Sequence, residues 1–173
     1  MIKRLGLSVA SLLLFAGCAN TTTQTRSASR QYPALVMPTP TAQTYRTPDG
    51  RTWTQRTDGG AQRLVFADAA APAPWTESIG FGKMSGKSFS DFKKAVPSLL
   101  DLRGVQSSVT EIDDQNIVIT TANPKLKTSV ARIIGQPNGF LMIEYVNRLP
   151  NREEAVRRWV TILSRPELSN AHW

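Results

Sequence analysis

The chain has 173 residues and a basic balance, with 21 Lys or Arg against 13 Asp or Glu and a net charge of +8. This length suits one domain plus a short extension. Its single histidine, His172, and single cysteine, Cys18, exclude a metal site built from imidazole and thiolate and a Ser-His-Asp or Cys-His catalytic triad. We therefore expect no cofactor.

The first seventeen residues have the pattern of a secretory signal peptide. Lys3 and Arg4 make the start positive, and residues 5–15 form an apolar run too short to remain in a bilayer as a spanning helix. Ala16 and Gly17 are small residues of the kind found before a cleavage site. Residues 1–17 are therefore predicted to be removed from an exported protein.

Cys18 follows directly, and the run Leu14-Phe15-Ala16-Gly17-Cys18 resembles the lipobox of bacterial lipoproteins, with Phe15 where that family prefers Leu. The resemblance implies that Cys18 carries acyl chains such as palmitate and anchors the protein to a membrane. Ala19, in place of Asp, implies the outer membrane, with the domain in the periplasm. Loss of Lys3 and Arg4 leaves a mature chain of about +6.

Residues 18–42 are rich in Thr, Ser, Ala and Pro, which predicts a disordered tether. The patch Ala34-Leu35-Val36-Met37 within it could instead dock on the domain or on a partner. We expect one folded domain over residues 43–168 and a flexible tail over 169–173.

Four strands are predicted in the first half of the domain. Residues 44–47 and 51–56 flank Pro48-Asp49-Gly50, which suits a hairpin turn because Pro presets the first dihedral and Gly accepts a positive φ. Further strands are expected over residues 61–67 and 75–84.

The stretch SIGFGKMSGKSFSDFKKA, residues 78–95, resembles a phosphate-binding loop at Gly86-Lys87-Ser88. Such a loop needs a glycine five positions before Gly86, because loop length fixes how many amides surround a phosphate. That position is Phe81, with Gly80 and Gly82 on either side. The spacing excludes a nucleotide site, and we interpret the glycines as letting the chain leave a strand and turn.

A helix is predicted to follow, with Ser88 as its cap and Asp91 in the first turn. Its apolar residues recur every three or four positions and mark one buried face: Phe89, Phe92, Val96, Leu99 and Leu100. Pro97 lies within this pattern and predicts a break or kink.

Four more strands are predicted over residues 105–111, 116–122, 128–135 and 140–148. A last helix should begin at Asn151 with Glu154 in a capping box and end at Arg165-Pro166. Its predicted inner face comprises Ala155, Val156, Trp159, Val160 and Leu163. The fold class is thus α+β, an antiparallel sheet of seven to eight strands with two helices packed on it. This order loosely resembles the Mog1/PsbP-like arrangement, in which two helices flank such a sheet.

Acidic residues give no strong catalytic or metal signal. Asp113 and Asp114 are too few for a calcium shell and suit an exposed hairpin tip. Glu144 interrupts the apolar run LMIEYV and is expected to point outward from an alternating strand, with a functional buried acid as the alternative. We expect no enzymatic activity.

Three groups of residues are candidates for binding a partner: Lys83, Lys87, Lys93 and Lys94; Arg152, Arg157 and Arg158; and Trp53 with Trp75. Nucleic acid is disfavoured because the compartment is wrong and aromatic residues do not alternate with basic ones. The sequence favours a lipid-anchored accessory or assembly protein of an envelope complex, such as a secretion, conjugation or pilus machine. The alternatives are an immunity or exclusion lipoprotein that inhibits one target, and a module that binds cell wall or anionic lipid.

Overall fold

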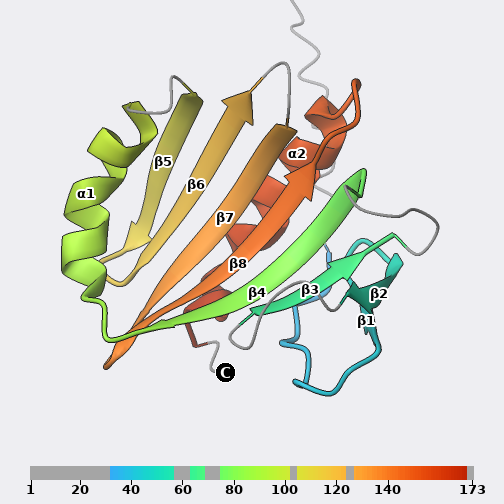
Figure 1. The fold of residues 1–173 in the computed structure, drawn as a ribbon, viewed down its shortest axis with the longest axis horizontal. Coiled ribbons are helices and arrows are strands. Elements are labelled where there is room, and N and C mark those ends of the chain that lie inside the picture. Colours follow the sequence, from blue (N-terminus) through green and yellow to red (C-terminus); the bar gives the residue numbers. More distant parts are fainter. Residues whose placement is uncertain (1–31, 57–62, 69–74, 102–104, 124–126, 171–173) are drawn as a thin grey trace, which may run out of the picture. The chain divides into compact units, whose positions relative to one another are not determined.

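The structure is a computed structural model that describes residues 32–56, 63–68, 75–101, 105–123 and 127–170. Within these ranges, four strands and a helix are followed by four strands and a second helix (Figure 1). The strands are β1 Thr44–Arg46, β2 Thr52–Arg56, β3 Arg63–Ala67, β4 Glu77–Ser85, β5 Gln106–Asp113, β6 Asn116–Asn123, β7 Lys127–Gln136 and β8 Gly139–Asn147. The helices are α1 Phe89–Asp101 and α2 Glu153–Leu163, with a short 3₁₀ helix at Pro166–Asn170.

All described strands form one antiparallel sheet in the order β1-β2-β3-β4-β8-β7-β6-β5. Each half of the chain contributes a meander, and β4 joins the two by pairing with β8 along its whole length, from Glu77 opposite Asn147 to Ser85 opposite Gly139. The predicted α+β class, with an antiparallel sheet and two helices, is confirmed.

Alternation along the strands divides the buried residues between two faces of the sheet. On one face, the larger core packs around Trp159 of α2 and includes Phe66, Ile143 and Tyr145. On the other face, a smaller core packs around Val96 of α1. We call these the α2 face and the α1 face (Figure 1). No helix among the described residues is long and apolar enough to cross a membrane.

The segment before β1 packs on the α2 face. Leu35 is buried within the core, and Tyr32 and Met37 pack against it. The Tyr45 hydroxyl donates a hydrogen bond of 2.7 Å to the carbonyl of Val36, and Arg165 donates one to the carbonyl of Tyr32. The tether predicted for residues 18–42 is therefore wrong where this segment packs on the core. For the patch Ala34-Leu35-Val36-Met37, the structure shows the alternative of docking on the domain. Residues 1–31, with the signal peptide and Cys18, lie outside the described residues.

Each helix differs from the prediction at one point: α1 at Pro97 and α2 at its first residue. α1 begins as expected, because the Ser88 hydroxyl accepts a hydrogen bond from the amide of Asp91 at 3.3 Å, but it continues through Pro97 without the predicted break. Val96 and Leu100, on either side of Pro97, pack on the sheet and hold the helix together.

α2 begins at Glu153, two residues later than predicted, with Arg152 at its N-cap and no side-chain cap. Glu154 therefore stands at the second helical position, where it cannot close a capping box, which needs the third. At the other end, Ser169 and Asn170 belong to the 3₁₀ helix, which corrects the flexible tail predicted for 169–173; residues 171–173 lie outside the described ranges.

Candidate functional site

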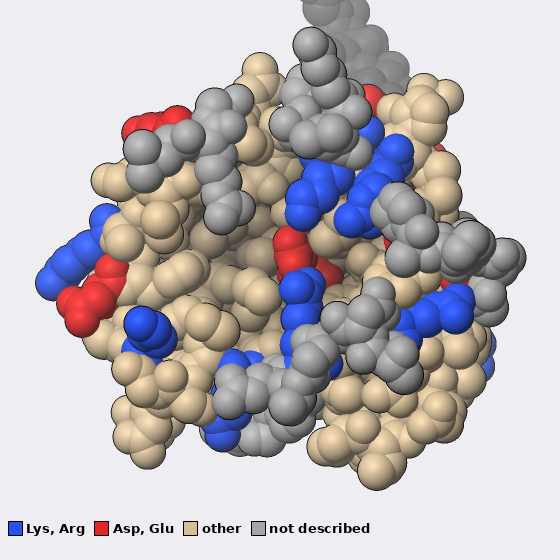
Figure 2. Space-filling view, in the orientation of Figure 1, with Lys and Arg blue, Asp and Glu red and all other residues tan. Residues whose placement is uncertain are grey.

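The α1 face is only partly covered by its helix. In Figure 1, α1 lies beside β5 at one edge of the sheet, far from β3. Its apolar residues pack on β6, β7 and the Phe140 end of β8, and the residues of β5 stay largely exposed. The Lys93 ammonium reaches the Glu111 carboxylate on β5 at 2.9 Å and ties the helix to this edge of the sheet. Figure 2 shows the same face as hollowed in its middle, with acidic atoms in the hollow and Lys and Arg around it. The candidate site lies where α1 leaves the sheet partly open.

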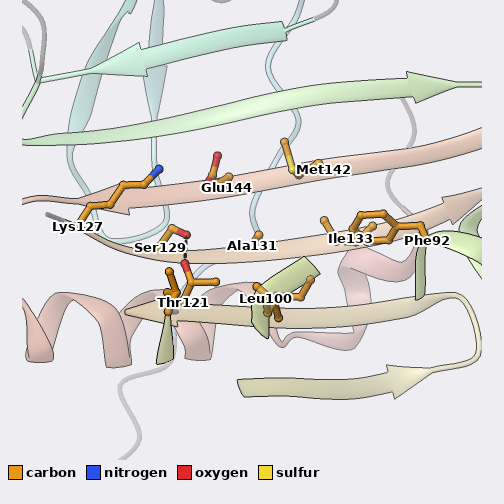
Figure 3. A pocket seen from close by; sticks show the side chains of 11 residues that line it. Phe92, Leu100, Thr121, Lys127, Ser129, Ala131, Ile133, Met142 and Glu144 are labelled. Atoms are coloured by element: carbon orange, nitrogen blue, oxygen red, sulfur yellow. Dashed lines mark hydrogen bonds between the residues drawn. The ribbon is translucent and has the colours of Figure 1, made fainter. Parts of the chain in front are cut away.

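A cavity of about 360 Å³ lies between α1 and the strands of this face. Its apolar wall comprises Phe92, Leu100, Val105, Ile119, Ala131, Ile133 and Met142 (Figure 3). Phe92 also contacts Phe140, with ring centroids 4.6 Å apart. The volume is in the range of small-molecule sites, which run from about 300 to 1,000 Å³.

The opposite end of the cavity is polar. Thr121 and Ser129 face each other across β6 and β7 with their hydroxyls 2.8 Å apart, and Lys127 begins β7 beside them (Figure 3). Lys127 is exposed and forms no ion pair with any residue that the structure describes. The cavity thus combines an apolar interior with a cation at its rim that has no ion-pair partner in the described part of the chain.

Glu144 lines the same rim and is already neutralised. Its carboxylate accepts a hydrogen bond of 2.8 Å from the Arg63 guanidinium, and its side chain is 17 % exposed. The prediction that Glu144 points outward is therefore wrong, because its side chain is half-buried, ion-paired and lines the cavity. Lys127 therefore gives the rim its excess positive charge.

Gly80 makes the contact between Arg63 and Glu144 possible. Arg63 lies on β3 and Glu144 on β8, so the guanidinium must cross β4, where Gly80 pairs with Glu144. A Cβ at Gly80 would lie 2.8 Å from Arg63 Nη2. Gly80 and Gly82 therefore lie inside β4, which corrects the prediction that they help the chain leave the strand. Gly86, with φ of +70°, does make the turn into α1.

A second polar cluster lies toward the α2 face. Tyr145 stacks on Trp159 and donates its hydroxyl hydrogen to Glu77, whose other oxygen accepts from Arg51 at 2.7 Å. Burial raises the pKa of Tyr145 above its usual range, and the adjacent Glu77 carboxylate adds to this. The Tyr145 hydroxyl is thus held protonated as a donor, which suits a structural link between strands.

Asp49 extends this second cluster to α2. Burial opposes its ionisation, but the hydrogen bond from Thr47 and the charges of Arg51 and Arg158 outweigh burial and hold the pKa of Asp49 below its usual value. Its carboxylate lies 3.0 Å from Arg51 and 3.3 Å from Arg158. These contacts join the β1–β2 turn to α2.

The structure does not bring the lysine group predicted from sequence into one site. Lys83, Lys87 and Lys94 are exposed, while Lys93 is paired with Glu111. Lys83 pairs in register with Leu141, so its side chain lies on the α2 face, away from the cavity.

The arginine group on α2 is mostly engaged within the domain. Arg158 pairs with Asp49, and Arg152 donates to the Thr128 hydroxyl at 2.7 Å and to the Leu149 carbonyl. Arg157 is exposed.

The two tryptophans differ in exposure. Trp53 is 2 % exposed in the α2-face core, with its indole N–H donated to Thr47, so its prediction as an interaction surface is wrong. Trp75 is half-buried with the Arg56 guanidinium 5.9 Å from its ring centre, and its carbonyl accepts a hydrogen bond from Arg148.

Cys18, the predicted lipidation site, lies outside the described residues.

Sequence reasoning missed Lys127, Thr121, Ser129 and Ala131. Their only signal is alternation: along the chain, the α1-face residues become more polar on β6 and less polar on the antiparallel β7. The described residues contain no group of three or more His, Cys, Asp or Glu placed to hold a metal ion.

No protein-family model matches this chain, and no curated protein matches it. It is similar to a protein of solved structure from Bacteroides thetaiotaomicron VPI-5482, with 18 % sequence identity and a TM-score of 0.39. The match covers 65 % of this chain and 40 % of that one.

Proposed function

We propose that this protein is a lipid-anchored, non-catalytic binding protein of the bacterial cell envelope, an accessory or assembly component of an envelope complex, and that the cavity of the α1 face is its binding site. The observation that carries the proposal is the cavity itself, which is apolar inside, charged at its rim and only partly covered by α1. An ordinary hydrophobic core is covered from solvent by the elements that pack on it, whereas an apolar concavity open to solvent usually serves binding.

The anchor is proposed from the sequence around Cys18, which resembles a lipobox. Two or more acyl chains give stable attachment, because each buried methylene adds about 0.8 kcal/mol and one chain alone is marginal. The domain would then face the periplasm from the outer membrane.

The anchor is tested by fractionating cells that produce the wild-type chain or Cys18→Ala. The wild-type protein should be in the membrane fraction with the mass of an acylated chain, and Cys18→Ala should be unacylated and soluble. A Cys18→Ala protein that stays in the membrane fraction would overturn the anchor.

The binding site is tested by a photo-crosslinking residue placed in living cells at Thr121, on the cavity rim, or at Lys83, on the opposite face. A discrete adduct is expected at Thr121 and none at Lys83. Equal adducts at both positions, or none at Thr121, would contradict a role for the cavity.

A further inference from the structure

We propose that the cavity of the α1 face binds a single-chain amphiphile with an anionic headgroup, with its apolar chain beneath α1 and its headgroup at Lys127. This inference rests on the proposed binding function and names its ligand class. Three observations carry it: a polarity gradient, the charge of the rim, and an available hydroxyl proton.

Three adjacent strands become apolar in the same direction along the cavity. The α1-face residues run from Thr121 to Ile119 on β6 and from Glu144 to Met142 on β8. On β7 they run from Lys127 through Ser129 and Ala131 to Ile133 (Figure 3). Six residues of strand span roughly 20 Å, so the gradient extends along an elongated site. A ligand that is polar at one end and apolar along its length matches this gradient, whereas a uniformly apolar partner surface does not.

The charge of the rim selects the headgroup. Arg63 neutralises Glu144 at 2.8 Å, while Lys127 has no ion-pair partner among the residues that the structure describes. Among the described residues that line the rim, together with Arg63, one net positive charge remains beside the apolar interior. A carboxylate or phosphate at the end of an acyl chain complements it.

The hydroxyl pair at the rim adds a hydrogen-bond donor. Thr121 and Ser129 lie 2.8 Å apart, and either can be the donor. Each hydroxyl carries one proton, so when one donates to the other, the acceptor keeps its own proton for another oxygen. A headgroup oxygen near Lys127 would accept it.

The test measures equilibrium binding of a fluorescent fatty acid, dansyl-labelled undecanoic acid, to the full chain carrying Cys18→Ala, so that no lipid attached there can compete. Saturable binding is expected, with displacement by unlabelled dodecanoate. Ala131→Phe, which places a ring in the cavity from its strand floor, should weaken binding at least tenfold. Absence of saturable binding would overturn the inference.

The headgroup assignment is tested with Lys127→Glu and the matched control Lys83→Glu, which makes the same charge change on the opposite face of the sheet. Lys127→Glu should weaken dodecanoate binding about tenfold and leave displacement by dodecanol, which has no charge, unchanged. Lys83→Glu should change neither. Equal effects of the two variants on dodecanoate would overturn the assignment.

These outcomes separate the inference from the proposed function. If crosslinking at Thr121 captures a protein while dodecanoate fails to bind, the cavity is a binding site and the amphiphile is wrong. If the fatty acid binds but Cys18→Ala remains in the membrane fraction, the ligand stands and the anchor is wrong.

Discussion

At the scale of single residues, glycines decide how closely the strands of this protein approach one another. Gly80 makes room for the end of the flexible Arg63 side chain, whereas Gly139 makes room for backbone. A Cβ at Gly139, where φ is +147°, would lie 2.0 Å from the carbonyl oxygen of Met84. Sequence reasoning interpreted Gly80 as letting the chain leave a strand, and neither of these packing constraints is visible from the sequence alone.

We expect Gly80→Ala and Gly139→Ala to differ strongly in stability. Gly80→Ala should cost about 1 kcal/mol or less, because the Arg63 guanidinium can move aside. Gly139→Ala should cost about 3 kcal/mol or more, because both the backbone contact and the positive φ resist a side chain. Urea unfolding of the two variants measures this, and equal losses would contradict it.

Asp49 should make stability depend on pH. Its pKa is lowered in the folded protein, so its contribution is present above the unfolded pKa, about 4, and is lost as the pH falls through the folded value. Asp49→Asn should be less stable by about 2 kcal/mol at pH 7. The difference from wild type should shrink as the pH falls toward 3, measured by urea unfolding at both pH values. A difference that does not change with pH would show that Asp49 acts only through shape.

At the scale of elements, hydrophobic alternation and turn residues predicted the strands to within about two residues. The start of α1 was also predicted, because Ser88 caps it locally. The errors lie where tertiary contacts outweigh local preference. Pro97 stays inside α1 because its neighbours pack on the sheet. At the start of α2, Arg152 is the N-cap residue, and its side chain donates to Thr128 and to the Leu149 carbonyl.

The segment before β1 is the clearest such error, and its docking can be tested. Leu35 is 7 % exposed in the core, whereas the adjacent Val36 is 73 % exposed. Leu35→Ala should therefore cost about 2–3 kcal/mol of unfolding free energy, and the matched Val36→Ala about 0.5 kcal/mol or less. If the two substitutions have the same small effect, residues 32–42 are not part of the folded domain.

At the scale of the whole molecule, the order of elements allowed the α+β class to be predicted, but it could not reveal the cavity. The cavity exists because α1 covers part of a sheet face whose remaining strands come from both halves of the chain. Lys127 and Ser129 can be identified as cavity residues only when β6, β7 and β8 are known to lie side by side. Sequence reasoning instead favoured clusters along the chain, and the structure shows four of those residues engaged within the domain: Trp53, Lys93, Arg152 and Arg158.

The central claim is that ligand enters the α1 face and not the α2 face of the same sheet. The most direct measurement is methyl NMR of the full chain carrying Cys18→Ala, titrated with dodecanoate. Ile119 and Ile133 report on the cavity, and Ile79 and Ile143 report on the opposite core. We predict saturable shifts for Ile119 and Ile133 while Ile79 and Ile143 stay in place. Shifts centred on Ile79 and Ile143, or no shifts at all, would contradict the account.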